Sequence, residues 1–170
     1  MKKLVLTLAI VFAGIMSANA QVWVGGGLGA QIEKNYKSIS LAPEVGYMIP
    51  NSPFTVALGA MYNYANNNGD ASNVVALQPY FRYAPLTIAD KFVLFFDLTA
   101  DFAIPNGGSY AVMLQPGIAW MATDKWTAAF RFGKVGYSHN FYADSEKHPI
   151  DGFMMSCDLA APSIRIYYNF

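Results

Sequence analysis

The sequence predicts an all-β fold, an eight-stranded antiparallel up-and-down β-barrel. Large apolar residues alternate with small or polar ones over many stretches of about ten residues, and this alternation has the period of a β-strand. A frame of Leu, Pro, an apolar residue and an aromatic at every second position also recurs, with prolines 36, 37 and 46 residues apart (79−43, 116−79, 162−116). That spacing is roughly the length of two strands with their connections, so the chain repeats a hairpin-sized unit.

Each copy of the frame has one large apolar face and one small or polar face. The copies span residues 41–47, 77–83, 114–120 and, in a looser form, 160–166. In the first copy Leu41, Pro43 and Val45 share a face, because side chains two apart in a strand point the same way. A soluble sandwich would bury this face, whereas a barrel in a membrane would turn it toward lipid. The frame alone leaves both arrangements open.

The first twenty residues have the parts of a secretory signal peptide. Lys2 and Lys3 give a positive start, an apolar run follows to residue 16, and a small-x-small site ends at Ala20. The apolar run is too short to cross a bilayer as a helix. We therefore expect residues 1–20 to be a signal peptide cleaved between Ala20 and Gln21, leaving residues 21–170 as one domain.

Composition favours the membrane arrangement. Charged residues make up 13% of the chain and hydrophobic ones 54%, against about 25% charged in soluble domains. After residue 20 no apolar run approaches the roughly 18 residues of a transmembrane helix. Such a chain fits a transmembrane β-barrel, the other fold that satisfies every backbone group in lipid. Without Lys2 and Lys3 the mature chain has a slightly negative net charge, which gives no case for nucleic acid binding, and the single Cys157 excludes an internal disulfide.

The first strand is expected at residues 22–32, where glycines make one face narrow. Turns are marked by Pro50 and Pro53, by the run Asn66 to Asp70 and by Asn106 with its following glycines. The remaining strands are expected at about 38–48, 54–64, 73–84, 92–101, 110–121, 126–137 and 154–170. An even number of strands lets the last pair with the first and leaves no open edge. The polar segments 65–72 and 138–152 are expected to be the long loops.

Alternation also predicts which face of each strand carries the charged side chains. All three arginines and three acids fall on the inner face, and we expect them to form a paired lumen charge network. Its members are Glu44, Arg82, Asp97, Asp101, Arg131 and Arg165. An eight-stranded barrel is only wide enough for its own side chains, so the lumen should be a packed polar core.

Two charged residues depart from this pattern. Alternation places Lys134 and Asp158 on the lipid face near the outer rim. They could form a cross-strand pair there, or Lys134 could reach a lipid phosphate; alternatively, a bulge reverses the register of the strand.

Proline within a paired strand removes a hydrogen-bond donor. A local bulge or a change of strand curvature at the repeated prolines is the best available explanation of how the barrel tolerates this loss.

The signal peptide, the repeated strands and the terminal residues 167–170 together resemble the small eight-stranded outer-membrane β-barrel domain family, which includes OmpX-like and OmpA barrel-like proteins. The resemblance implies a monomer in the cell outer membrane, surrounded by outer-membrane lipids and lipopolysaccharide. It also implies that Tyr168 and Phe170 form the C-terminal signal recognised by the barrel assembly machinery. It indicates architecture better than activity, because such barrels carry different functions.

Catalysis has little support in the sequence. His139 and His148 lie in the long polar segment with Ser138, Asp144 and other acids, but a flexible loop is a poor support for a Ser-His-acid triad or a metal site. The glycines at 25–29 precede no helix and do not form a phosphate-binding loop. We expect no enzyme activity, no cofactor and no metal, and a structural or interaction role at the cell envelope. A narrow channel for small solutes, a lipid-modifying enzyme and a soluble lipocalin-like barrel remain alternatives.

Overall fold

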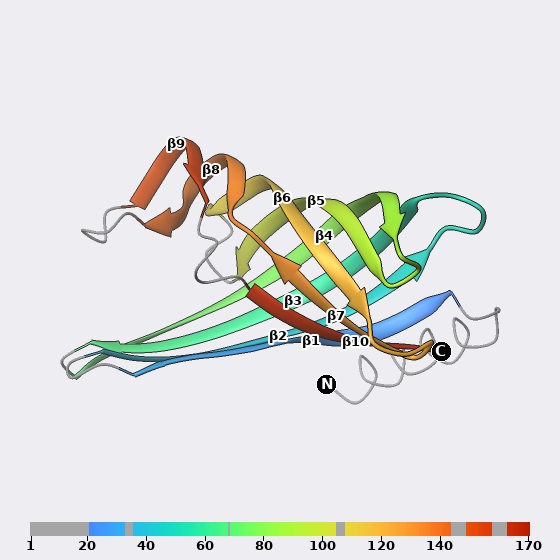
Figure 1. Ribbon diagram of the computed structural model, residues 1–170. Coiled ribbons are helices and arrows are strands. Elements are labelled where there is room, and N and C mark those ends of the chain that lie inside the picture. Colours follow the sequence, from blue (N-terminus) through green and yellow to red (C-terminus); the bar gives the residue numbers. More distant parts are fainter. Residues whose placement is uncertain (1–20, 33–35, 68, 105–107, 144–148, 158–162) are drawn as a thin grey trace, which may run out of the picture.

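The computed structural model describes residues 21–32, 36–67, 69–104, 108–143, 149–157 and 163–170, which form ten β-strands (Figure 1). The expected signal peptide, residues 1–20, lies outside the described residues. None of the described segments forms a helix long and apolar enough to cross a membrane. The strands are β1 (Val22–Ile32), β2 (Tyr36–Met48), β3 (Phe54–Asn67), β4 (Asp70–Ile88), β5 (Phe92–Ile104), β6 (Tyr110–Met121), β7 (Trp126–Arg131), β8 (Lys134–Ala143), β9 (Pro149–Ser156) and β10 (Ser163–Asn169).

Eight of these strands close into an antiparallel barrel, which confirms the predicted fold class. Neighbouring strands pair in the order β1, β2, β3, β4, β5, β6, β7, β10, and β10 pairs with β1 to close the ring. We call the end with the short turns at residues 49–53, 89–91 and 122–125 the turn end, and the opposite end the hairpin end. β1 begins and β10 ends at the turn end, where Trp23 pairs with Asn169.

The seventh and eighth predicted strands are each divided in two. β7 and β10 complete the barrel near the turn end. β8 and β9 form a hairpin, and β8 pairs with the first half of β6, from Tyr110 to Leu114. β9 pairs with β8 and, among the described residues, with no other strand. In Figure 1 this hairpin leans away from the long strands β1 to β4, which extend beyond the barrel at the hairpin end.

A β-bulge between β7 and β8 confirms one of the three alternatives for Lys134, the bulge that reverses the register. Gly117 pairs with Arg131 and Leu114 pairs with Val135, so four steps along this strand face three steps along β6. Gly133 has a φ of 70° at the bulge, a conformation that glycine adopts without strain. The extra residue reverses the alternation, and Lys134 therefore lines the lumen instead of facing outward. Its suggested partner Asp158 lies outside the described residues.

The strand prolines interrupt the pairing with the following strand and leave the pairing with the preceding strand intact. The register of β2 with β3 skips Ala42 and Pro43 and resumes unchanged, and that of β4 with β5 skips Gln78 and Pro79 in the same way. The bulge just described lies opposite Pro116, where Pro116 O accepts a hydrogen bond of 2.9 Å from the backbone N–H of residue 132. The pairing with the preceding strand continues through all three prolines. Each missing N–H donor therefore interrupts the backbone hydrogen bonds to one neighbouring strand only, and only locally. The fourth proline of the repeat lies outside the described residues.

Two segments expected to be long loops are instead extended hairpins. β3 and β4 remain paired from Tyr64 opposite Asn73 to Asn67 opposite Asp70, within the predicted loop 65–72. β8 and β9 likewise occupy most of the predicted connection 138–152. Polar residues at these positions predict loops, but hairpins that project from a barrel have both faces in a polar environment and need no apolar alternation.

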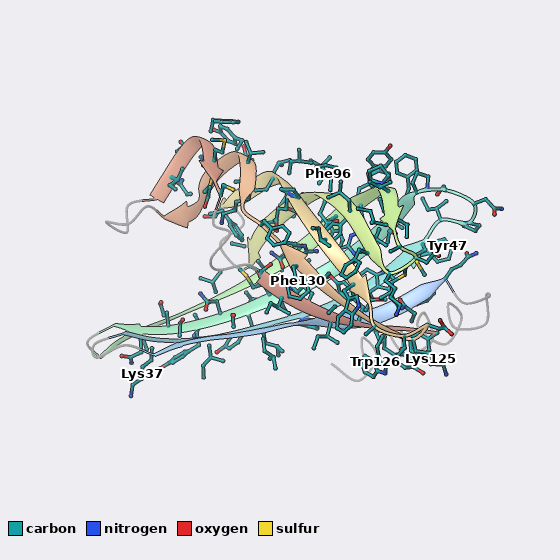
Figure 2. All side chains as sticks on the ribbon, viewed as in Figure 1. Lys37, Tyr47, Phe96, Lys125, Trp126 and Phe130 are labelled. Atoms are coloured by element: carbon teal, nitrogen blue, oxygen red, sulfur yellow. The ribbon has the colours of Figure 1, made fainter. Side chains whose placement is uncertain are left out.

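The distribution of side chains is inverted relative to a soluble barrel. Large apolar side chains project from the wall, as Figure 2 shows for Phe96 and Phe130, with Leu58 49% and Ile166 54% exposed. Aromatic residues gather at the turn end, where Trp126 packs edge-on against Tyr168. The interior combines buried charges with an aromatic cluster around Trp23 and Tyr167.

Candidate functional site

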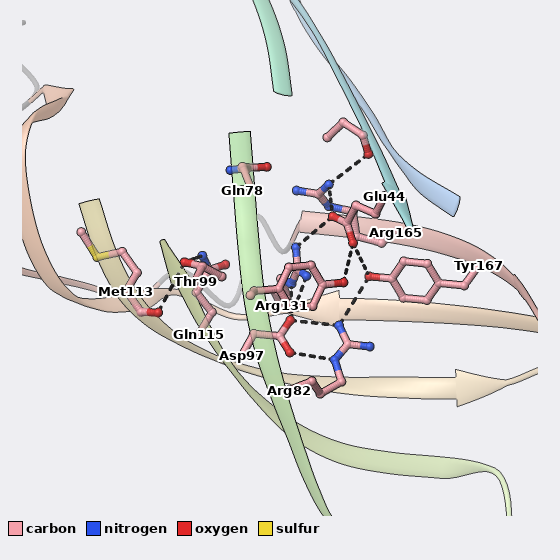
Figure 3. Close-up of polar contacts among 12 residues, drawn as sticks. Glu44, Gln78, Arg82, Asp97, Thr99, Met113, Gln115, Arg131, Arg165 and Tyr167 are labelled. Carbon is pink, nitrogen blue, oxygen red and sulfur yellow. Dashed lines mark hydrogen bonds and ion pairs between the residues drawn. The ribbon is translucent and has the colours of Figure 1, made fainter. Parts of the chain in front are cut away.

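The interior of the barrel is organised around the carboxylate of Glu44, on β2. Its Oε1 accepts hydrogen bonds from Nη1 of Arg131, at 3.3 Å, and from Nη1 of Arg165. Its Oε2 accepts hydrogen bonds from the hydroxyls of Tyr80, at 2.7 Å, and Tyr167, at 3.2 Å. Four donors from three other strands, β4, β7 and β10, therefore converge on one buried carboxylate, which satisfies both of its oxygens (Figure 3).

Asp97 is the second acceptor and is fully buried. Arg82 binds it through two parallel hydrogen bonds, Nε to Oδ1 at 2.7 Å and Nη2 to Oδ2 at 2.9 Å. Arg131 approaches the same carboxylate, with Nε 2.8 Å from Oδ2. Because Arg131 also contacts Glu44, it links the two carboxylates into one network.

The strand register explains why these residues meet. Arg82 and Asp97 are directly opposite each other in the pairing of β4 with β5, and cross-strand partners place their side chains on the same face. Arg131 and Arg165 lie on the adjacent strands β7 and β10, where Arg165 pairs with a neighbour two residues before Arg131. The inner faces of neighbouring strands thus bring residues from distant parts of the sequence into contact.

Aromatic rings complete the surroundings of the guanidinium groups. The guanidinium carbon of Arg82 lies 4.0 Å from the ring centre of Phe95, and that of Arg131 lies 4.9 Å from the ring centre of Tyr80. Such contacts stabilise a cation by about 0.5 to 2 kcal/mol. Burial of these charges is thus offset by paired carboxylates, tyrosine hydroxyls and aromatic faces together. We call the set Glu44, Tyr80, Arg82, Asp97, Arg131, Arg165 and Tyr167 the lumen cluster.

The lumen cluster divides the interior into two cavities. One, of about 290 Å³, lies on its hairpin side and is lined by Glu44, Arg131 and Arg165 together with Gln78 and Lys134. The other, of about 470 Å³, lies toward the turn end; its lining includes Arg82 and Tyr167 of the cluster, and most of the rest is apolar. The first is lined mostly by polar and charged residues and the second mainly by apolar ones, so the two cavities are chemically distinct.

Asp101 belongs to the predicted network but contacts a different partner. It is fully buried, and its Oδ1 accepts a hydrogen bond of 2.9 Å from Nε2 of Gln78. Lys134 interacts electrostatically with it. The other five predicted network residues are brought together in the lumen cluster, while Asp101 lies beside the polar cavity.

Tyr167 is the main contributor that sequence reasoning missed. It is 2% exposed, donates to Glu44 and packs against Trp23 with ring centres 4.3 Å apart. Alternation from Arg165 would have placed it on the inner face. The C-terminal pair Tyr168 and Phe170 lies at the turn end, where the two rings contact each other at 5.2 Å.

The catalytic candidates do not assemble into a triad among the described residues. Ser138 is fully buried, whereas the adjacent His139 is partly exposed and lies 3.0 Å from Oδ1 of Asp151 across the hairpin. Neighbouring residues in a strand point to opposite faces, so this serine and histidine do not meet. His148, Asp144, Ser145 and Glu146 lie outside the described residues. No group of metal-ligating side chains is found within the residues that the structure describes.

No protein-family model matches this chain, and no curated protein sequence is significantly similar to it. The barrel architecture and the side chains themselves are therefore what can be used to infer its role.

Proposed function

We propose that this protein is an integral outer-membrane β-barrel with a structural or interaction role at the cell envelope. The observation that carries the proposal is the inverted distribution of side chains. Leu58, Leu98 and Ile166 are about half exposed on the outer wall, while Arg82, Arg131 and Asp97 are buried inside. Exposed apolar patches of this extent are rare on soluble monomers and are expected where acyl chains cover a wall.

Two further features support a membrane location. The aromatic residues at the turn end match the belt that amphipathic rings form at the level of lipid headgroups; this set includes Tyr83, Phe92, Trp120, Trp126 and Phe170, all of them exposed. The expected signal peptide would deliver the chain beyond the inner membrane. In this proposal, lipids and lipopolysaccharide surround the barrel and the assembly machinery recognises Tyr168 and Phe170, as in the OmpX-like barrels that the chain resembles.

The lumen cluster favours a sealed barrel over a channel. Its ionic members Glu44, Arg82, Asp97 and Arg131 are each less than a tenth exposed and lie between the two cavities. Solute would have to break these ion pairs to pass. Single-channel recordings in planar bilayers should therefore show no conductance, and steady conductance would support the channel alternative.

Substitution of an outward residue separates a membrane barrel from a soluble one. Leu98 lies in the middle of β5 and is 50% exposed, so Leu98→Arg would place a charge near the bilayer centre. This costs about 2 to 4 kcal/mol on a lipid-facing wall and almost nothing on a surface in water. Ser52→Arg, in an exposed turn, is the matched control.

The readouts are membrane fractionation and heat-modifiable gel migration of the protein made in cells. We expect the wild type and Ser52→Arg to fractionate with the outer membrane and to migrate differently before and after boiling. Leu98→Arg should lower the amount of folded, membrane-bound protein. Wild-type protein in the soluble periplasmic fraction, or normal assembly of Leu98→Arg, would contradict the proposal.

A further inference from the structure

The cavity on the turn side of the lumen cluster, which we call the turn-end pocket, has the size of a small-molecule site. Its volume is about 470 Å³, and ligand pockets range from about 300 to 1,000 Å³. The lumen cluster closes its inner end, and the exposed Met48 and the exposed turn 122–125 lie at its mouth. All its lining residues, and the turns 49–53, 89–91 and 122–125 at this end, belong to the described part of the chain.

Most of the pocket wall is apolar. Two of its polar residues satisfy each other, because Nδ2 of Asn169 donates a hydrogen bond of 3.2 Å to Oγ1 of Thr127. Asp124 and Lys125 carry opposite charges and are exposed at the mouth. The apolar and aromatic lining includes Trp23, Ala84, Val93, Phe95, Met121 and Tyr167. The wall therefore favours a ligand with an apolar body.

Arg82 presents an unused donor to this pocket. The residue is 8% exposed, and its Nε and Nη2 bind the carboxylate of Asp97, while Nη2 also donates to the hydroxyl of Tyr167 at 3.5 Å. Nη1 makes no hydrogen bond to any described residue and lies on the side of the guanidinium away from Asp97 (Figure 3). Asp97 is also shared with Arg131, so one carboxylate faces two guanidinium groups. The free side of Arg82 is therefore suited to an anionic acceptor.

Trp23 supplies a second buried donor. It is 3% exposed, and its indole N–H makes no hydrogen bond to any described residue, although a buried indole N–H usually has a partner. The ring centres of Trp23 and Tyr167 are 4.3 Å apart, and the guanidinium carbon of Arg82 lies 5.5 Å from the same tyrosine ring centre. Two buried side chains with unused donors therefore flank one ring in this pocket.

We propose that the turn-end pocket binds a small carboxylate with an apolar body. The carboxylate accepts hydrogen bonds from Nη1 of Arg82 and from the indole N–H of Trp23, and the body lies against Val93 and Phe95. An ionised carboxylate only accepts hydrogen bonds, so it matches two donors better than a hydroxyl does. This inference rests on the proposed function, in which the mature chain begins at Gln21, at this end of the barrel.

The test uses protein purified from cell membranes in nonionic detergent, with its first residue established by intact-mass measurement. Decanoate has both the carboxylate and the apolar body, decanol lacks the carboxylate, and acetate lacks the body. We expect decanoate to bind at least tenfold more tightly than either of the others, as measured by native mass spectrometry and by titration calorimetry. Equal affinities for decanoate and decanol, or for decanoate and acetate, would overturn the inference.

Three variants locate the site. Ala84→Phe and Met121→Trp each place a larger side chain in the pocket, and each should weaken decanoate binding at least tenfold. Ala122→Phe adds a ring at an exposed turn position that does not line the pocket, so it should bind decanoate as the wild type does. Heat-modifiable migration identifies the variants that retain the folded barrel. A folded Ala84→Phe or Met121→Trp protein with wild-type affinity would refute the assignment of the pocket.

Arg82→Lys tests the donor directly. Lysine keeps a cation beside Asp97 but lacks the nitrogen that faces the pocket, so we expect decanoate affinity to fall about tenfold and decanol affinity to stay unchanged. Unchanged decanoate affinity, or an equal loss for both ligands, would contradict the role assigned to Arg82. The signal peptide and the membrane location are tested separately, by the intact mass and by fractionation of the wild type, so failure of the proposed function can be told apart from failure of this inference.

Discussion

Replacing Arg82 by methionine tests whether the lumen cluster holds the barrel together. The change removes two hydrogen bonds to the buried Asp97, of 2.7 and 2.9 Å, and the contact with the ring of Phe95. Breaking a buried ion pair costs about 3 to 5 kcal/mol, because the remaining charge is left unpaired. Asp97 keeps its contact with Arg131, so we expect a loss near the lower end, about 3 kcal/mol.

Arg165→Met provides a graded comparison. The side chain of Arg165 is 13% exposed, and its partner Glu44 retains Arg131 and two tyrosine hydroxyls after the change. We therefore expect a smaller loss, about 1 to 2 kcal/mol, typical of one hydrogen bond to a charged group. Lys91→Met, in an exposed turn, is the control and should stay within about 0.5 kcal/mol of the wild type.

Reversible urea unfolding in lipid vesicles, followed by tryptophan fluorescence and gel migration, measures these differences. The expected order of free energy of unfolding is wild type and Lys91→Met highest, then Arg165→Met, then Arg82→Met. An Arg82→Met protein as stable as the wild type would refute the view that the paired charges stabilise the barrel.

Two glycine substitutions test the packing and the bulge. Gly46→Ala would place a Cβ 2.2 Å from Cζ2 of the buried Trp23, so we expect a loss of about 1 to 3 kcal/mol in the same urea assay with altered tryptophan emission, whereas Gly59→Ala, whose Cβ would meet its nearest neighbour at 3.3 Å, should cost less. Gly133→Ala would combine a φ of 70° with a Cβ 2.2 Å from a backbone oxygen and should cost more than Gly69→Ala, which has a positive φ but no atom within 4 Å. Equal stabilities within either pair would contradict the corresponding contact.

The sequence by itself determined the fold class and the inner face. Alternation with a period of two is a local property of each strand, so it identified the strands and placed Glu44, Arg82 and Asp97 on one face before any pairing was known. The excess of apolar residues then indicated which face points outward. These conclusions need no knowledge of which strands are neighbours.

Which side chains pair with each other inside the lumen was decided by the tertiary structure. Alternation put Asp101 with the other acids, but the register places it opposite Ala111 on β6 and within hydrogen-bonding distance of Gln78. Tyr167 donates to Glu44 only because ring closure brings β10 near β2. Which donors reach which acceptor follows from the stagger of eight strands, and no single segment encodes that stagger.

The bulge between β7 and β8 was also decided at the tertiary level. A single extra residue at Gly133 reverses the side chains that follow it in β8. Alternation alone placed Lys134 on the outer face and left the bulge as an alternative, and only the pairing with β6 decided between the two. The periodicity of a strand is a property of neighbouring residues, whereas register and closure arise from contacts between residues far apart in the sequence.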